Sequence, residues 1–414
     1  MTDVAVEALG SIFVDGAAYA DPARWHAAAK RIRDESPLLK VSLDGWPEFW
    51  AVTKHADVKE IERNPEIFTN APNPIVVPGS GSSITEEEPP VKTLPQMDGD
   101  EHKAHRGIVN DWFKPASVKQ LRDRIDELAQ RYVDRMADMG GRCDFVTDVA
   151  LHFPLQVISS VLGLPESDHQ RMLTLTQELF GSENPDIARR LANDDSMIEA
   201  LVNMVQYFTA LASDRQAQPT SDLASVIANA EIDGRPLSDM DMLGHFVIIA
   251  TAGHETTSSA IGGGLLALLE QRDQLEMLQA NPELIDNAAD EFIRFVSPVK
   301  HFMRTCREPY AIRGVTIQPG DRTLLSYASA NRDDEVFPDP MRLDVRRPNA
   351  ASHLAFGFGR HFCLGAHLAR MEIRAIFRHL LARIAHMELA GEPAWTHAIL
   401  AQGPKSIPIT YQMR

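Results

Sequence analysis

Cysteine is scarce in this chain of 414 residues, which contains three, Cys143, Cys306 and Cys363. Their odd number and wide spacing argue against a disulfide framework and against a structural zinc site. Apolar runs are also short, because no stretch approaches the roughly 18 residues of a membrane span. The acidic first residues, MTDVAVEALG, lack the apolar region of a signal peptide. These absences favour a soluble, cytoplasmic protein with no membrane partner.

Positive charge is in deficit as well, since 41 lysine and arginine residues face 58 aspartate and glutamate residues, for a net charge of −17. A balance of this sign argues against nucleic acid and against anionic lipid as partners. No internal repeat is visible, and 44% hydrophobic with 24% charged residues is ordinary globular composition. A chain of this length can bury a large core and enclose a cofactor.

Helical periodicity dominates the chain between about residues 100 and 280. Together with short strands on either side, it predicts a fold class that is mainly α with small β-sheets, in one domain over residues 1–414. Helices are predicted at 21–33 (with Asp21 as N-cap), 118–139, 197–212, 284–295 and 364–384. Strands are predicted at 38–43, 49–53, 310–317, 322–326 and 406–411.

A long segment between residues 71 and 100 is rich in proline, glycine, serine and glutamate. Its composition predicts a loop, and long ordered loops in compact proteins are often lids or binding loops. Apolar residues such as Ile75, Val76 and Leu94 are interspersed in it, which favours a lid over a substrate pocket at 71–97. A flexible linker between domains is the alternative.

The most informative stretch is FGFGRHFCLG, residues 356–365. Gly357 and Gly359 permit positive φ angles and a close backbone approach. Cys363 precedes a helix predicted to begin at Leu364, and the free N–H groups at a helix N-terminus stabilise a thiolate and lower its pKa. A thiolate held in this way is a good axial ligand for haem iron. A buried free thiol is the alternative for a lone cysteine.

This string closely resembles the haem-binding loop of the cytochrome P-450 family, the haem-thiolate monooxygenases, because every fixed position of the pattern F-G-x-G-x-[HR]-x-C-x-G is met. The resemblance implies a cytochrome P-450 fold with haem b (iron protoporphyrin IX) between a long central helix and the cysteine-loop helix. It implies that Cys363 binds the iron and that Phe356, His361 and Gly365 contact the cofactor. In this family the thiolate favours cleavage of the O–O bond.

A second motif, AGHETT at 252–257, lies within a helix predicted over 238–270. Such a helix is roughly 50 Å long at 1.5 Å per residue, a length that suits a helix crossing the whole molecule. Glu255 is costly there unless it is paired or functional. Thr256 is expected to hydrogen-bond the carbonyl four residues back and to bend the helix. A kink with a solvated glutamate is the alternative, and the glycine run at 262–264 predicts close packing.

AGHETT resembles the family's distal acid–alcohol pair. The resemblance implies that Glu255 delivers protons to iron-bound dioxygen and that Thr256 hydrogen-bonds the activated oxygen, which are general-acid and positioning roles. It also places Ala252 and Gly253 beside the cofactor, where they leave room for a small ligand.

Glu291 and Arg294 stand at i, i+3 in DEFIRFVSP and share one helix face, so an exposed surface pair is one interpretation. The string resembles the family's E-x-x-R, and the third partner is then Arg347 in LDVRRP. Arg346 stays open as that partner, because Leu343 departs from the family's Phe at this motif. The implied role is structural, a buried Arg–Glu–Arg network under the thiolate loop.

His102 and Arg106 stand at i, i+4 in GDEHKAHRG, a spacing that also suits a solvated helix face. The segment resembles the family's D-P-P-E-H-x-x-x-R, with Gly-Asp in place of Pro-Pro. The resemblance implies that these two residues, with Arg304 and His361, neutralise the two haem propionates through charge-assisted hydrogen bonds.

The resemblance also places the substrate under the lid and against the central helix. The expected lining is apolar and predicts a small hydrophobic substrate; its candidate residues are Ile248, Thr251, Ala252, Val299 and Phe302. The stretches 298–305, 324–337 and 403–409 look most like the terpineol-hydroxylating subfamily. They favour a monoterpenoid or an aromatic hydrocarbon.

The resemblance is to the soluble bacterial type, which implies dioxygen as co-substrate and electrons from NAD(P)H through a separate reductase and a ferredoxin or flavodoxin. Lys103, Arg106 and Arg360 are the basic residues expected to meet an acidic carrier. Two other functions stay open. One is a peroxide-driven peroxygenase, which has less need of Glu255 and Thr256; the other is a non-catalytic haem-thiolate sensor, against which the lack of an output domain speaks.

Overall fold

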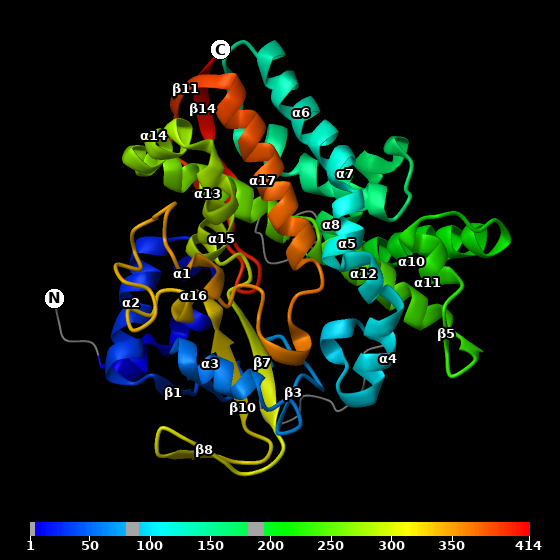
Figure 1. The fold of residues 1–414 in the computed structure, drawn as a ribbon. Helices are drawn as coiled ribbons and strands as arrows, with labels where there is room; N and C mark the ends of the chain where they lie inside the picture. The colour runs from blue at the N-terminus through cyan, green and yellow to red at the C-terminus, as the bar shows by residue number, and fades with distance from the viewer. Residues whose placement is uncertain (1–4, 80–90, 181–193) are drawn as a thin grey trace.

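Helices make up most of the structure, a computed structural model that describes residues 5–79, 91–180 and 194–414 (Figure 1). Near the N-terminus lie α1 (Gly16–Tyr19), α2 (Pro22–Glu35) and α3 (His55–Glu62). The middle of the chain contains α4 (Gly99–Asn110), α5 (Pro115–Gln120), α6 (Arg122–Asp138), α7 (His152–Val161), α8 (His169–Phe180), α10 (Asp194–Ala217), α11 (Leu223–Ala228), α12 (Asp239–Ala252), α13 (Glu255–Glu270), α14 (Arg272–Ala280) and α15 (Ile285–Val296). The last helices are α16 (Tyr327–Ala330) and α17 (Ala366–Arg383).

The strands form small sheets, as the sequence predicts. The largest has the order β1 (Leu38–Val41), β2 (Phe49–Val52), β10 (Arg322–Ser326), β7 (His301–Cys306) and β3 (Phe68–Thr69), with β10 parallel to β2 and antiparallel to β7. A three-stranded sheet has the order β11 (Ile384–Leu389), β14 (Pro408–Met413) and β4 (Arg142–Asp144). The two-stranded pairs are β5 (Glu231–Ile232) with β6 (Arg235–Pro236), β8 (Tyr310–Ile312) with β9 (Val315–Ile317), and β12 (Ala394–Trp395) with β13 (Pro404–Ser406).

The molecule has a sheet side and a helical side. In Figure 1 the large sheet and the helices α1, α2 and α3 lie on one side of the molecule, and α6, α7, α8 and α10 lie on the other. The helices α13 and α17 lie between these two sides. The main hydrophobic core belongs to the helices, and two smaller buried clusters pack on the sheet. Within the described ranges, no helix is both long and apolar enough to cross a membrane.

Helix ends follow local signals at some positions and not at others. The N-terminal helix α2 starts as predicted, because the side chain of Asp21 accepts the Arg24 N–H at 3.1 Å. The single helix predicted over 118–139 is wrong: the chain forms α5 and α6, which meet at Leu121. A tight turn in which Leu121 N–H donates to the Val118 carbonyl ends α5.

The central helix predicted over 238–270 is present but broken between α12 and α13. Ser238 caps its start, accepting the Asp241 N–H. The break falls at Gly253 and His254, immediately before the AGHETT carboxylate. A Cβ on Gly253 would lie 3.1 Å from Ile158 Cγ1 of α7, so glycine lets the two helices approach here.

The glycine run at 262–264 lies where α13 meets α15, and the predicted close packing is confirmed. A Cβ on Gly263 would lie 2.6 Å from Val296 Cγ2, and one on Gly264 would lie 2.9 Å from Phe292 Cγ. The helix that carries the AGHETT motif is therefore fixed against the helix that carries Glu291.

The predicted lid at 71–97 falls partly on residues 80–90, which lie outside the described residues. Its first part is held on the large sheet, because Met303 N–H donates to the Pro74 carbonyl at 2.7 Å and Arg322 donates to the Asn73 carbonyl at 2.9 Å. Met97, at its other end, is buried. A function as a lid remains a prediction.

Candidate active site

Cys363 lies in a tight loop that precedes α17. Its backbone N–H donates to the Phe356 carbonyl at 2.8 Å, which closes the loop. Gly357 and Gly359 have φ angles of +67° and +70°, and a Cβ on Gly359 would lie 2.5 Å from the carbonyl oxygen of Glu62. Both glycines are therefore needed, one for its backbone conformation and the other also for space.

The helix after this loop begins later than the sequence suggests. Gly365 is the N-cap and Ala366 the first helical residue, so the predicted start at Leu364 is wrong. Two residues thus separate Cys363 from the helix. The sulfur still lies close to the helix N-terminus, because it accepts the N–H of Gly365, the N-cap.

The electrostatic setting of Cys363 also differs from the prediction. Burial raises the pKa of the Cys363 thiol, whereas the Gly365 N–H and the charges of Arg106 and Arg370 lower it. The expected low pKa is wrong for the protein alone, because desolvation outweighs these three groups. A thiolate here needs a further positive partner, and a metal ion bound to the sulfur supplies one. Among the described residues, no group of three His, Cys, Asp or Glu side chains is placed to hold a metal ion.

One face of the central helix has accessible surface in the middle of the molecule. Ile248, Ala252, Glu255 and Thr256 recur at helical spacing and are half-buried or exposed, while most residues between them are buried. Glu255 combines this accessible surface with strong desolvation, and so does Cys363. A side chain that has accessible surface and is nevertheless strongly desolvated is typical of the lining of an enclosed space. The two groups belong to neighbouring elements, because α13 contacts α17, the helix that follows the cysteine loop.

The acid and the alcohol of AGHETT lie side by side at the helix break. Burial raises the pKa of Glu255 to about 7, and within the described residues it forms no ion pair. The Thr256 hydroxyl donates to the Ala252 carbonyl at 2.8 Å, as expected for a residue that bends its helix. The arrangement offers a carboxyl able to hold a proton near neutral pH beside a hydroxyl.

The four residues expected to bind the cofactor's carboxylates surround the cysteine loop. The rings of His102 and His361 lie 4.3 Å apart, and Arg106 donates to the Phe362 carbonyl at 2.8 Å. His361 Nε2 is buried and lies 3.4 Å from an oxygen of Asp98, so a protein carboxylate already faces this ring, and burial lowers the pKa of His361. Arg304 already donates to a protein carboxylate, that of Glu62, at 2.9 Å.

The structure joins Glu291, Arg294 and Arg347 in one buried network. Arg294 reaches the two Glu291 oxygens at 2.7 and 2.8 Å, and Arg347 Nε reaches them at 3.0 and 3.1 Å. Arg346 is exposed, so Arg347 is the third partner. Leu343, at the position where the family has Phe, is fully buried beside this network.

The residues expected to line the substrate pocket do not share one environment. Ile248 and Ala252 belong to the accessible face of the central helix, whereas Thr251 is buried and donates to the Val247 carbonyl at 2.6 Å. Val299 and Phe302 are half-buried at the start of β7 and pack on the cluster beside the large sheet. Ile248 and Ala252 thus share the accessible face of the central helix, whereas the hydroxyl of Thr251 is used within its own helix.

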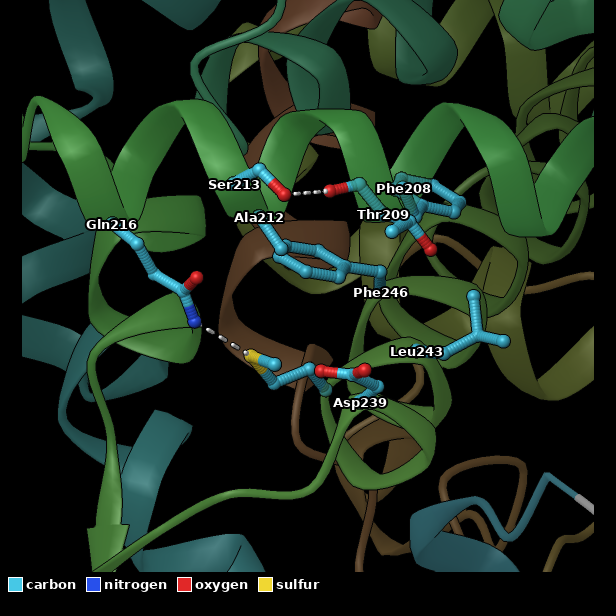
Figure 2. Close-up of a pocket in the computed structure, with 9 residues that line it drawn as sticks. Phe208, Thr209, Ala212, Ser213, Gln216, Asp239, Leu243 and Phe246 are labelled. Atoms are coloured by element: carbon cyan, nitrogen blue, oxygen red, sulfur yellow. Dashed lines mark hydrogen bonds between the residues drawn. The ribbon is translucent and has the colours of Figure 1, made fainter.

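A separate pocket of about 90 Å³ lies between α10 and α12 (Figure 2). Phe208 and Phe246 stack with ring centroids 5.2 Å apart at its inner side, and Gln216 closes one end by donating to Met242 Sδ at 3.7 Å. None of the predicted site residues lines it. The side chains that line it are a mixture of polar and apolar ones, and they form no cluster of reactive groups.

Sequence reasoning missed three groups beside the site, of which Glu62 and His254 are buried and Asp98 is half-buried. Glu62 contacts Arg304, and Asp98 accepts the backbone N–H groups of Asn70 and Ala71. His254 is buried at the helix break, with Nε2 2.8 Å from the Leu151 carbonyl. The break itself marks His254, but nothing local marks Glu62, which looks like one more charge on a surface helix.

Comparison with known proteins gives a consistent result. A family model described as Cytochrome P450 matches residues 84–392. The chain is 40% identical to Cytochrome P450-terp of a Pseudomonas species, over 95% of each chain, and 35% identical to the Steroid C26-monooxygenase of Mycolicibacterium smegmatis, over 83% of this chain and 79% of that one. Its fold is similar to the crystal structure of CYP108D1 from Novosphingobium aromaticivorans, with a TM-score of 0.90 and 35% identity over 99% of each chain. It is also similar to Mycobacterium marinum CYP268A2 in complex with pseudoionone, with a TM-score of 0.87 and 30% identity over 97% of each.

Proposed function

The chain belongs to the cytochrome P450 family, whose members hold haem b and act as monooxygenases, and we propose that it hydroxylates a small hydrophobic molecule with dioxygen. The observation that carries the proposal is the cysteine loop. Its sulfur keeps accessible surface although it is strongly desolvated, and the central helix carries a carboxyl and a hydroxyl, Glu255 and Thr256, that are also half-buried.

In this proposal each residue of the site has a distinct task. Cys363 ligates the iron, and the bound haem supplies the oxygen-activating chemistry. His102, Arg106, Arg304 and His361 hold the cofactor's carboxylates, the two arginines by their charge and the two histidines as N–H donors, because burial lowers the pKa of His102 to about 4 and also lowers that of His361. Glu255 holds a proton near neutral pH and passes it on, and Thr256 orients the acceptor of that proton.

We propose a monoterpenoid or an aromatic hydrocarbon as the substrate. The name of Cytochrome P450-terp and the pseudoionone bound to CYP268A2 support a terpenoid-like molecule. The apolar side chains of Ile248, Val299 and Phe302 are expected to bind it, with Ala252 leaving room above the haem, and the segment 71–97 is expected to cover it.

We propose that electrons come from NAD(P)H through a reductase and a ferredoxin or flavodoxin. Lys103 is exposed, while Arg106 and Arg360 lie at the cysteine loop, where an acidic carrier could approach a protein that is otherwise acidic. All three cysteines are free, which supports a reducing compartment, the cytoplasm.

A carbon monoxide difference spectrum tests the proposal. The reduced, CO-bound protein is expected to show the red-shifted Soret band of a thiolate-ligated haem, and Cys363→Ser is expected to abolish it. A band that persists in this variant would remove Cys363 as the ligand. Cys143→Ser is the matched control, because Cys143 is a free, buried cysteine in β4, and it should leave the band intact. A spectral screen of terpenoids and aromatic hydrocarbons then identifies the substrate class.

A further inference from the structure

The last turn of α3 packs directly against the cysteine loop. Lys59 Nζ lies 4.8 Å from the ring centroid of Phe358, and a Cβ on Gly357 would lie 3.3 Å from Glu62 Oε1. A Cβ on Gly359 would lie 2.5 Å from the Glu62 carbonyl oxygen. The two loop glycines therefore lie against the same residue, one against its carboxylate and the other against its backbone.

The carboxylate of Glu62 is buried and is bound by two side chains from elsewhere in the chain. Arg304 Nη2 of β7 and the Tyr327 hydroxyl of α16 both donate to Glu62 Oε1, at 2.9 and 2.7 Å. Burial raises the pKa of Glu62 to about 7, against the opposing influence of Arg304, Tyr327 and the Phe358 N–H. A buried carboxylate of this kind is kept in place by its partners, and removing one partner is costly.

Arg304 is the same residue that is expected to bind a haem carboxylate. Its guanidinium is held from two sides, because Nη1 donates to the Met303 carbonyl at 2.9 Å and Nη2 donates to Glu62. One carboxylate thus touches both the loop that carries Cys363 and the arginine that is expected to bind a haem carboxylate. Glu62 therefore connects Arg304 to the cysteine loop.

We propose that Glu62 is a positioning residue that fixes Arg304 relative to the cysteine loop, so that one buried carboxylate aligns the two ends of the haem site. The proposal rests on the proposed haem-binding function, and it adds a residue that the family motifs in the sequence do not mark. The opposite role is that of a competitor, in which Glu62 draws Arg304 away from the haem carboxylate.

The chain offers a matched control on the same helix. Glu60 also accepts a tyrosine hydroxyl, that of Tyr310 at 2.9 Å, and among the described residues it forms no ion pair with an arginine. Glu60→Gln and Glu62→Gln are therefore the same substitution on α3, two residues apart, each leaving a tyrosine partner in place.

Transfer of haem from the holoenzyme to excess apomyoglobin separates the two roles. Glu62→Gln is expected to release haem about tenfold faster than the wild type, the order expected when one hydrogen bond between charged groups is lost. Glu60→Gln is expected to stay within about twofold of the wild type. Slower release from Glu62→Gln would identify a competitor, and an unchanged rate, or equal acceleration in both variants, would also overturn the proposal.

Hydrogen–deuterium exchange on the purified full chain tests the loop contact without relying on haem. Peptides over 354–363 are expected to exchange about tenfold faster in Glu62→Gln and to be unchanged in Glu60→Gln. Unchanged exchange in both variants would overturn the proposal.

The exchange test does not depend on the proposed function. If the wild type showed no thiolate band, the proposed function would be refuted, but the exchange rates of the two variants would still decide whether Glu62 holds the cysteine loop. If Glu62→Gln does not fold, Tyr327→Phe replaces it, because it removes one donor and keeps the charge. A two- to threefold acceleration is then expected, and none would contradict the proposal.

Discussion

Glu291 in α15 and Glu255 in α13 belong to helices that pack on each other, but their surroundings differ. Glu291 is fully buried, and two arginines occupy both of its oxygens at 2.7–3.1 Å. Glu255 has accessible surface and, among the described residues, no ion pair. One carboxylate is a fixed charge that joins distant segments, and the other is a site where a proton can be held and released.

The physical cause of this difference is the balance of desolvation against pairing. A buried charge is tolerated when partners replace the lost water, and such a pair is then strongly destabilising to break. A desolvated carboxyl without a partner responds by taking up a proton, so its pKa rises. The same residue type therefore serves the fold in α15 and proton chemistry in α13. Changing either set of partners tests this contrast.

The largest effect is expected at the network. Arg347→Met leaves Glu291 with one arginine and several carbonyls without their donor, and it should lower the free energy of unfolding by about 3–5 kcal/mol. Arg346→Met, one residue away and exposed, should change it by less than about 0.5 kcal/mol. Urea unfolding of both variants measures the difference. Equal effects in the two variants would mean that the network does not hold the fold.

This pair of arginines also shows how far the sequence leads. The i, i+3 spacing of Glu291 and Arg294 predicts their pairing, because one helical turn separates them, whereas Arg347, 56 positions from Glu291, is predicted by the family motif alone. The choice between Arg346 and Arg347 depends on how the segment after Leu343 turns, and that turn is set by tertiary contacts. The pairing of Glu62 with Arg304 crosses 242 positions and leaves no local sequence signal.

The break in the central helix is also only partly predictable from the sequence. AGHETT predicts the bend through Thr256, whose hydroxyl competes for a backbone carbonyl four residues back. The full interruption at Gly253 and His254 also needs Ile158 of α7 against the glycine and the Leu151 carbonyl against the histidine. Those contacts belong to packing between helices, which periodicity along one helix cannot reveal.

The second effect concerns Glu255 and depends on pH. Its pKa is raised from 4.5 to about 7 in the folded protein, so its contribution to stability is fully present below pH 4.5 and is lost as pH rises toward 7. Glu255→Gln should therefore match the wild type near pH 4.5 and exceed its unfolding free energy by about 1–3 kcal/mol at pH 8, the lower end applying where water screens the charge. Thermal unfolding at the two pH values measures this. An advantage that is the same at both values would show that Glu255 is not a desolvated, titrating group.

The smallest effect on stability, and the sharpest one on function, is expected at Thr256. Among the described residues, its hydroxyl donates to the carbonyl of Ala252 at the end of α12, and alanine has the higher helix propensity, so Thr256→Ala should shift the free energy of unfolding by no more than about 0.5 kcal/mol. Removal of the hydroxyl leaves the proton held by Glu255 without its neighbour at the break. Hydroxylated product formed per oxygen consumed should therefore fall severalfold, with the difference appearing as peroxide. Thr256→Ser keeps the hydroxyl and should restore the yield. If Thr256→Ala still forms the wild-type amount of product per oxygen consumed, the Thr256 hydroxyl has no part in proton transfer. The helix break at Gly253 and His254 would then differ from the Glu291 network only in how its residues pack.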